Sequence, residues 1–479
     1  MLLALLGILV PVAGAVITLL WKSKQTRPRW LAVIAVLHLA ITFGAVIYPP
    51  ELTPGQWLWL DPPGRLVLLL VSTLFAILSI YAVGYLRARS GQPNRIFCAC
   101  LLMFLGMMTF VTWAHHLGLM WVAVEASTLS SAPLLYFNRN PQSLEATWKY
   151  LMVGSVGIAL ALLGSLFMGY AAVSTGEHTS LLFDDLARHA PSFAKLWLHI
   201  SFVLLAVGYG TKMGLAPMHT WKPDAYGEAP GLVGGLLAGA RTSCAFLALL
   251  RVFRILVTAG ESAFASRVLL LLGVFSMGLA GVFLIRQRDF KRMLAYSSVE
   301  HMGILVIGLG LGATGAFGAL LHMFNNGVIK GAMFLSAGNI HRAFGSKQVQ
   351  KVSGAFRYVP WSAAAFLACL FAVTGSPPFA PFVSEFTVLG AAMEQHRYAV
   401  AGLMLVFLLV AFLGMGGTVL GMVQGEATAP GQEAEFREGR LTIVPIMILL
   451  AISLVMGLAL PPALRDLVRD AGEYVGGGR

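Results

Sequence analysis

The chain has 479 residues, of which 58% are hydrophobic and only 11% are charged. This balance excludes a soluble globular protein of this length and predicts an all-α polytopic membrane protein. The net charge of +12 would suit a protein that binds nucleic acid, but the basic residues gather in short segments between apolar runs, as in KSKQTRPR and RQRDFKR. That distribution is typical of membrane topology, so no nucleic-acid partner is expected.

Apolar windows of about 20 residues, long enough to cross a bilayer, recur along the whole chain. The first, MLLALLGILVPVAGAVITLLW, lacks a basic leading segment and a convincing cleavage site, so it is interpreted as a span and not as a signal peptide. The fourteen expected spans are approximately 2–21, 30–48, 65–86, 96–114, 116–137, 148–172, 194–216, 229–256, 265–285, 294–312, 314–339, 361–389, 398–423 and 441–462.

The basic segments predict how these spans are oriented. Most Lys and Arg residues of the loops follow odd-numbered spans, so these loops are expected on the cytoplasmic side of a bacterial or archaeal inner membrane. With fourteen spans, both termini are then expected outside. The segment SLLFDDLARHAPSFAKLW alternates apolar and charged residues at near-helical spacing, which indicates a linker helix on the membrane surface.

Two spans are interrupted by Gly and Pro, the seventh at MGLAPMHTW and the twelfth at TGSPPFAPFVSEF. Because they lie five spans apart, they suit two inverted five-helix repeats with discontinuous helices at matching positions, an arrangement that points to an ion path. The expected division is 1–95 for helices 1–3, 96–256 for the first repeat, 257–423 for the second, and 424–479 for an acidic loop, helix 14 and a short tail.

Among the ionisable side chains inside the expected spans, five stand out, each in a different span. They are Glu125, Lys212, Arg241, Lys330 and Glu385. An ionised group at mid-bilayer costs about 3 kcal/mol or more, so such residues normally face a protein interior and pair with one another. One alone could be a structural salt bridge. Five indicate a chain of polar stations, and because a Glu–Lys pair near water can change protonation when either partner moves, they predict a path for protons.

Histidine and amide side chains add to this line. His322 precedes Lys330 by eight residues, two helical turns on the same face, and an imidazole can pass a proton on near neutral pH. Asn326 lies midway on that face and could hold a water molecule. Three further residues are expected near span ends, where water is closer, and could equally be interfacial side chains: His219, Glu300 and His301.

Five motifs together resemble the antiporter-like subunits shared by respiratory complex I, Mrp-type cation/proton antiporters and group 4 membrane-bound nickel–iron hydrogenases. The resemblance extends from about Leu101 to Gly421, and the segment NRNPQSLEATWKYLMVGSVGIALALLG is most similar to the hydrogenase-4 component F subgroup of formate-hydrogenlyase-like complexes. The motifs are WVAVEASTLSSAPLLYF, TKMGLAPMHTWKPDAYGEAP, DFKRMLAYSSVEHMG, LLHMFNNGVIKGAMFLSAGNI and GSPPFAPFVSEF.

The resemblance implies a role for each buried charge. Glu125 and Lys212 match the coupled pair of the N-terminal half-channel. His322 and Lys330 match the central axis of the C-terminal half, and Glu385 matches the exit residue.

Two positions depart from the family pattern. The family often has a bridging Lys where this chain has Ser243, with Arg241 two residues earlier, and many relatives have His where this chain has Asn326. A permanently charged Arg can position water but relays a proton poorly. Arg241, His219, His301 and Asn326 are therefore expected to tune the path.

The sequence thus predicts a proton-translocating, non-catalytic subunit of a redox-driven membrane complex. No HExxH, Walker A, GxSxG or dinucleotide-binding Gly motif occurs. The resemblance implies nickel–iron and iron–sulfur centres, or quinone, only in partner subunits that include other membrane chains and a peripheral redox module. The alternatives are a complex I subunit, an Mrp-type Na⁺/H⁺ antiporter subunit, a stand-alone secondary transporter, and a membrane scaffold for a soluble enzyme.

Overall fold

The computed structural model describes residues 1–176, 179–426 and 436–478. Within these ranges the regular secondary structure is helical, and β interactions are confined to three isolated bridges. Eleven of the described helices are long and apolar enough to cross a membrane by length and composition. The chain is a multi-pass membrane protein, as its composition predicts.

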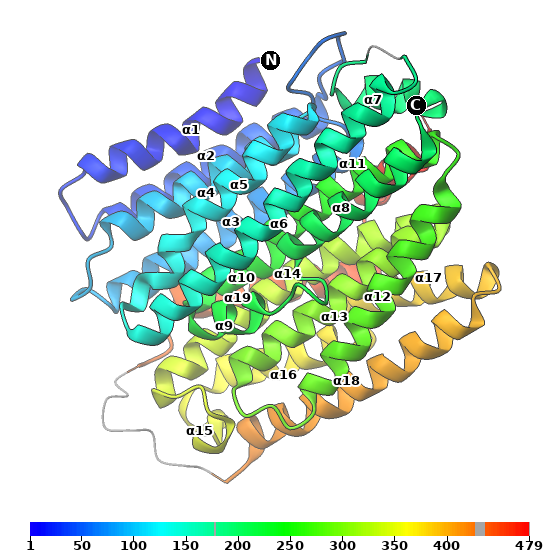
Figure 1. Cartoon of the computed structure of the whole chain (residues 1–479). Helices are drawn as coiled ribbons and strands as arrows, with labels where there is room; N and C mark the ends of the chain where they lie inside the picture. The colour runs from blue at the N-terminus through cyan, green and yellow to red at the C-terminus, as the bar shows by residue number, and fades with distance from the viewer. Residues whose placement is uncertain (177–178, 427–435, 479) are drawn as a thin grey trace.

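α1 and α2 form one side of the bundle, and α3 lies inward of them (Figure 1). α3 begins where the side chain of Asp61 accepts a hydrogen bond from the backbone N–H of Gly64 at 2.8 Å, and two prolines occupy its first turn, where no N–H is needed. α3 is buried over most of its length, whereas the two helices before it keep exposed apolar faces. The bounds are α1 (Leu2–Leu20), α2 (Arg27–Ile47) and α3 (Pro62–Arg87).

The next group of helices includes the expected surface helix. It is the short α7, whose acidic and basic residues are accompanied by buried Phe183 and Leu186, so one of its faces packs on the bundle. The bounds are α4 (Arg95–Trp113), α5 (Leu117–Leu135), α6 (Pro141–Val173), α7 (Phe183–His189), α8 (Lys195–Met213), α9 (Trp221–Glu228), α10 (Gly231–Leu236) and α11 (Thr242–Thr258).

The remaining helices surround α14, which passes through the centre of the bundle and is buried along almost its whole length. Each of the fourteen expected spans overlaps at least one helix: 229–256 covers α10, a π-helical turn and α11, and 361–389 covers α16 and α17 with a break between them. The division into inverted repeats stays a prediction, and residues 427–435 of the expected acidic loop lie outside the described ranges. The bounds are α12 (Ser262–Leu284), α13 (Phe290–Gly310), α14 (Gly312–Phe344), α15 (Ala355–Tyr358), α16 (Pro360–Val373), α17 (Ala380–Glu394), α18 (Tyr398–Gln424), α19 (Arg440–Leu458) and α20 (Pro462–Val475).

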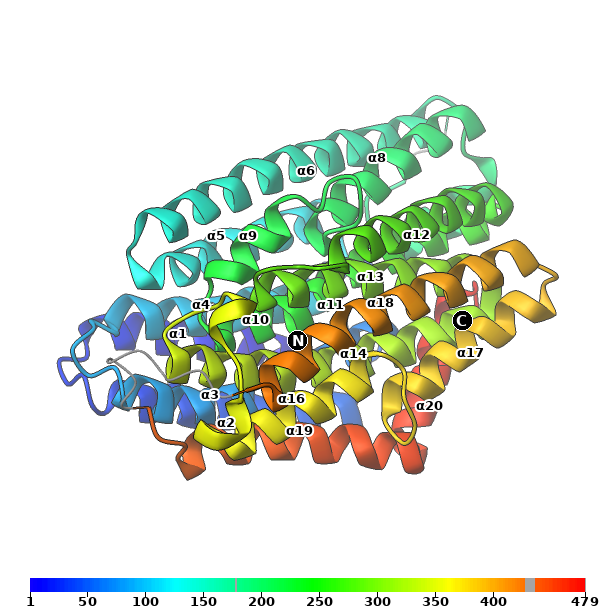
Figure 2. The same cartoon turned by 90° about the horizontal axis from the view of Figure 1, so that it is seen from below.

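α6 and α8 lie side by side with their backbones in contact (Figure 2). Gly157 and Gly164 of α6 and Gly208 of α8 line this contact, which we call the glycine seam. A Cβ at Gly157 would lie 2.6 Å from the Cβ of Thr211, and one at Gly164 would lie 2.7 Å from the Cγ of Leu205. Gly208 approaches the α6 backbone equally closely. Small residues let membrane helices approach in this way and gain close van der Waals contact.

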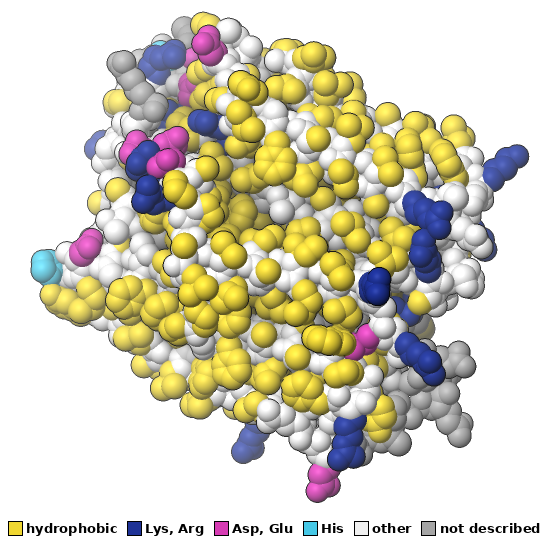
Figure 3. Space-filling view, turned by 180° about the vertical axis from the view of Figure 1, so that it is seen from behind, with side chains coloured by type: hydrophobic (Ala, Val, Ile, Leu, Met, Phe, Trp, Pro, Cys, Tyr) yellow, Lys and Arg dark blue, Asp and Glu magenta, His cyan; other side chains and the backbone are white. Residues whose placement is uncertain are grey.

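The loops gather at two ends of the bundle. The loops after odd-numbered spans contact one another, as when Arg27 Nη1 donates to Asn94 Oδ1 at 2.9 Å, and we call this the basic end. At the opposite end lie the N-terminus and the C-terminal end of α20 (Figure 1). Figure 3 shows a broad apolar surface between the two, with Lys and Arg gathered at one end and mixed charges at the other.

Both expected helix breaks are present. α8 ends at Gly214, whose φ of 81° lies in the left-handed region and whose N–H bonds Gly210 O at 2.8 Å, and the chain resumes as α9 only after Pro217. The second break separates α16 from α17 and contains Gly375 with a φ of 67°. Proline donates no N–H and glycine tolerates a positive φ, so these residues end the helices inside the bundle.

Candidate functional site

Lys212 occupies the last turn of α8, directly before the break. Its side chain is 1% exposed, and its Nζ donates hydrogen bonds to Glu125 Oε2 at 2.7 Å and to Thr128 Oγ1 at 2.9 Å. Gly154 of α6 leaves room for the ammonium, since a Cβ there would lie 3.2 Å from Nζ. Glu125 of α5 keeps 19% of its side chain exposed. The pair therefore joins a deeply buried amine to a carboxylate nearer the protein surface.

The carbonyl groups at the cut end of α8 are bonded by side chains from outside that helix. The last carbonyls of a helix have no intrahelical partner, and positive charge is favoured beside them. The donors are Trp221 Nε1 to Thr211 O at 2.9 Å, Arg241 Nη1 to Lys212 O at 3.0 Å and Lys222 Nζ to Met213 O at 2.7 Å. Two cations thus stabilise a helix end inside the bundle.

Arg241 is the last residue of a π-helical turn, Leu237–Arg241, between α10 and α11. Its Nη2 donates to Thr128 Oγ1 at 3.2 Å, and its guanidinium lies 5.0 Å from the ring centroid of Tyr150 and 5.3 Å from that of Trp221. Thr128 is therefore shared with Lys212. A guanidinium held in this way can orient its neighbours but keeps its proton.

Lys222, which the sequence analysis did not single out, is fully buried. A Cβ on Gly214 would lie 2.6 Å from its Cδ, so the lysine packs against the turn that ends α8. Its Nζ also lies 3.3 Å from Ser298 O, which connects the break to α13. The residue falls between the seventh and eighth expected spans, where a lysine is typical of a loop. Its position just after the Gly- and Pro-rich interruption of the seventh span is the sequence feature that could have identified it.

Lys330 of α14 donates to Ser297 Oγ at 2.7 Å. Ser297 directly precedes Ser298, so adjacent residues of α13 contact Lys330 and Lys222. Lys330 also interacts electrostatically with Lys222 and with Glu300. The expectation that Glu300 lies near a span end is wrong, because α13 begins at Phe290 and places Glu300 at its middle. Glu300 is 2% exposed there, and its Oε1 has no hydrogen-bond partner among the described residues.

His301 is likewise in the middle of α13 and not at its end, and it contacts His322 of α14. The hydroxyl of Ser384 donates to Pro381 O at 2.9 Å, so it accepts from His322 Nδ1, also at 2.9 Å. His322 Nε2 then accepts from His301 Nδ1 at 3.0 Å, and this order of donors follows from the network for neutral rings. Glu385 Oε1 lies 4.0 Å from His301 Nδ1.

The ligand atoms of His301, His322 and Glu385 all lie within 4.8 Å of one another. Two imidazoles and a carboxylate are a donor set that zinc accepts, so these residues could also hold a metal ion. In the described part of the chain no hydrogen bond or ion pair links Lys330 to His322 or to Glu385. The structure therefore brings the site residues together as two groups, one around Lys212 and one around His322.

The amides and the remaining histidine lie between and beside these groups. Asn325 Nδ2, not Asn326, reaches α17, donating to Ala380 O at 2.8 Å. Asn326 is buried, and its Oδ1 accepts no hydrogen bond from the part of the chain that the structure describes, which leaves an acceptor that a water molecule can use. His219 is 6% exposed, with Nδ1 3.2 Å from Pro217 O, so it is buried in the first break.

A second buried ion pair joins Asp61 to Arg251 away from this line. The guanidinium contacts both carboxylate oxygens, with Nε at 2.7 Å from Oδ2 and Nη2 at 2.8 Å from Oδ1, and it also donates to backbone carbonyls at the end of α4. A bidentate pair that is fully hydrogen-bonded fixes geometry. It clamps α3, α4 and α11 together.

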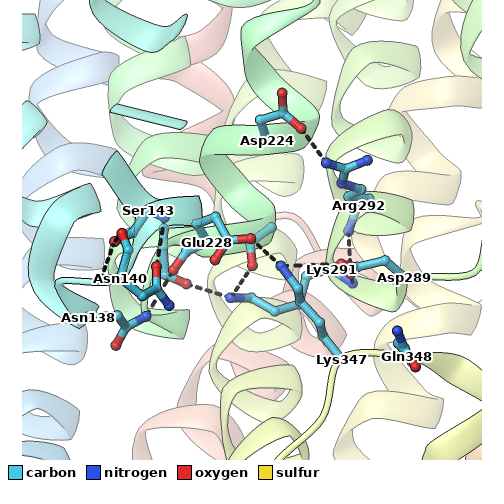
Figure 4. A network of polar contacts seen from close by, with 12 residues as sticks. Asn138, Asn140, Ser143, Asp224, Glu228, Asp289, Lys291, Arg292, Lys347 and Gln348 are labelled. Carbon is cyan, nitrogen blue, oxygen red and sulfur yellow. Dashed lines mark hydrogen bonds and ion pairs between the residues drawn. The ribbon is translucent and has the colours of Figure 1, made fainter. Parts of the chain in front are cut away.

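A polar network at the basic end connects α9 with α13 (Figure 4). Arg292 pairs with Asp224 at 2.5 Å, and Lys347 bridges Glu228 and Asp289, the latter at 3.5 Å. The segment that follows the α8 break is thereby tied to the helix that carries Glu300 and His301.

Comparison with known proteins places this geometry in a family. Residues 114–413 match the family described as NADH:quinone oxidoreductase/Mrp antiporter, TM. The chain is 34% identical to the hydrogenase-4 component F homolog of Methylacidiphilum infernorum (isolate V4) over 76% of this chain and 79% of that protein. It is 26% identical to a Na(+)/H(+) antiporter subunit of Alkalihalophilus pseudofirmus over 99% and 97% of the two chains. A chain of the membrane-bound sulfane sulfur reductase, an archaeal respiratory membrane complex, has the same fold, with a TM-score of 0.88, 22% identity and coverage of 99% and 98%.

Proposed function

The chain belongs to the NADH:quinone oxidoreductase/Mrp antiporter transmembrane family, and on that premise we propose that it moves protons for a redox-driven complex of the group 4 hydrogenase type. It is an antiporter-like membrane subunit with charged residues buried in its interior. The observation that carries the proposal is the 2.7 Å contact between Lys212 and Glu125 at the cut end of α8. The similarity to the hydrogenase-4 component F homolog supports the choice of complex.

In the N-terminal half, Glu125 exchanges protons with the surface and Lys212 takes them inward. A change in a partner subunit that separates the pair leaves a buried ammonium without its counter-charge, a state that passing the proton onward relieves. Lys222 is the next acceptor, because its Nζ lies at the same cut helix end. Lys222 would thereby take the role of the bridging lysine that relatives often have at the position of Ser243.

In the C-terminal half, Lys330 receives the proton, since Lys330 contacts Ser297 and Lys222 contacts Ser298, two adjacent residues of α13. His322 and His301 then form a hydrogen-bonded pair, and His301 lies beside Glu385, the exit carboxylate. Asn326 and the unbonded oxygen of Glu300 supply acceptors for water between Lys330 and His322.

A second candidate function is that of an Mrp-type Na⁺/H⁺ antiporter component. The similarity to the antiporter chain of Alkalihalophilus pseudofirmus, which covers nearly the whole of both chains, favours it. Both candidates use the same residues and differ in the partner chains and in whether Na⁺ moves. The other two alternatives, a stand-alone transporter and a scaffold for a soluble enzyme, do not require the assembled complex to pump protons.

We place the basic end on the cytoplasmic side and both termini outside, by the excess of Lys and Arg in the loops at that end. Cysteines introduced singly at Lys24 and at Glu473 test this in intact cells, because an impermeant thiol reagent should label only the second.

The proposal is tested on the native complex. Its co-purifying chains are identified by mass spectrometry, and proton movement is followed in inverted membrane vesicles when the electron donor is added. Co-purifying redox subunits and donor-driven acidification are expected. A complex without redox chains that exchanges Na⁺ for H⁺ would establish the antiporter function instead, and a pure chain that takes up solute alone would contradict both.

A further inference from the structure

Two hollows of the surface meet at the C-terminal end of α12. The first is a groove of about 420 Å³ between α12 and α18, and its lining is apolar except for Arg286 and Thr418. Gly417 forms part of its floor, and nothing lies within 4 Å of the place where a Cβ would stand there. The groove therefore has the apolar lining that a hydrocarbon chain needs, and it lies along the half of α18 nearer the basic end.

The second hollow is a cleft of about 610 Å³ at the basic end, lined mainly by charged and amide side chains. Its two acidic residues, Glu228 and Asp289, are both bonded by Lys347 (Figure 4). Arg286 and Arg288 are exposed and form no ion pair with any residue in the described ranges. The cleft thus has two uncommitted guanidinium groups, which match a phosphodiester in shape and charge.

Ile285 and Arg286 line both hollows, so the apolar groove opens directly into the basic cleft. We propose that the two together bind one anionic phospholipid of the membrane, with its phosphate at Arg286 and Arg288 and an acyl chain along Gly414 and Gly417. Basic pockets between membrane helices recognise anionic headgroups in this way, and exposed arginines at a helix end reach the headgroup level.

The conformation of Arg286 supports a role for its side chain. Its φ of 56° lies in the left-handed region, where glycine is favoured over any other residue. Replacing it with glycine should therefore preserve the turn while removing the guanidinium. This makes Arg286→Gly a variant in which loss of lipid can be separated from loss of fold.

The experiment measures phospholipids that remain with the intact complex after purification, by mass spectrometry. The wild-type complex should retain phosphatidylglycerol or cardiolipin above their share in the membrane. Arg286→Gly combined with Arg288→Gln should lower the affinity for anionic lipid roughly fivefold per arginine. Gly417→Leu, which fills the groove, should release the same lipid. The matched controls are Arg357→Gln and Gly421→Leu, exposed residues near the same end that line neither hollow.

Two further measurements distinguish the occupants. A photoreactive residue at Leu413 in the native complex should form an adduct with lipid, and an adduct with a neighbouring polypeptide would overturn the proposal even if a variant fails to assemble. Inorganic phosphate added to the delipidated complex should not replace phosphatidylglycerol in raising its thermal stability. Wild-type lipid retention by both the arginine and the glycine variants, or full replacement by free phosphate, would equally overturn it.

Discussion

Removing either partner of the pair between Glu125 and Lys212 should stop pumping, but the two removals should differ in stability. In Lys212→Met the residue left behind is a carboxylate whose side chain is 19% exposed. In Glu125→Leu the residue left behind is an ammonium whose side chain is 1% exposed. The difference in burial decides how much each variant loses.

The magnitudes follow from the contacts that remain. After Lys212→Met, Thr128 keeps its hydrogen bond from Arg241 at 3.2 Å and Glu125 keeps part of its solvation, so we expect a loss of about 1 kcal/mol. After Glu125→Leu, the ammonium retains only the Thr128 hydroxyl as a side-chain partner, and an uncompensated buried charge costs about 3–5 kcal/mol. The difference of about 3 kcal/mol is roughly a hundredfold in the folded-to-unfolded ratio.

Both variants are made in the native complex, and the assembled amount, the thermal unfolding midpoint and donor-driven proton movement per assembled complex are measured. Lys195→Met is the matched control, the same substitution at the exposed start of the same helix, and it should change none of them. Wild-type pumping by Lys212→Met would refute the role of the pair. Equal stability of Lys212→Met and Glu125→Leu would refute the argument from burial.

Three further predictions use the same assays. Lys222→Met should lose pumping while assembly is largely kept, because methionine fits the space and no carboxylate is left unpaired; normal pumping would exclude Lys222 from the path. Glu385→Gln should lose pumping with the fold intact, and poor assembly that Lys330→Met restores together with pumping would show instead that the two form a structural pair. Asp61→Leu should destabilise the chain by about 3–5 kcal/mol because Arg251 stays buried without its counter-charge, and adding Arg251→Met should recover part of that loss in a thermal unfolding measurement; a double variant less stable than the single one would contradict this.

The helix breaks could be predicted because their causes are local. Gly214 and Pro217 end α8 by a positive φ and a missing N–H, properties that any reader of the sequence can assign. The buried charges could also be found, because an ionised residue in an apolar run stands out. That Glu125 meets Lys212 was implied by the resemblance, and the structure places the two in contact across 87 residues of chain.

The direction in which a side chain points after a break could not be read from the sequence. Lys222 stands in a polar segment that suits a loop, and only the fold of the α8–α9 turn shows that it points inward. The expected span 294–312 excludes the charged residues that form the first turn of α13, which begins at Phe290. Glu300 therefore lies closer to the start of that expected span than to the start of the helix. Asp61 and Arg251 are 190 residues apart, and no local pattern pairs them.

The glycine seam between α6 and α8 fixes the position of Lys212, and through it the distance between the Glu125 and Lys212 charges. Where the two backbones are in contact, no side chains lie between them that could rearrange. α6 and α8 are therefore expected to move together as one rigid unit and not to slide past each other. A single methyl group at Gly157, 2.6 Å from the Cβ of Thr211, would act as a wedge beside Lys212 and shift the ammonium with both charges still present. A conformational change that separates Glu125 from Lys212 must therefore move α5 or the break after α8. A larger residue at Gly157 can change the distance between the two charges while both side chains remain present.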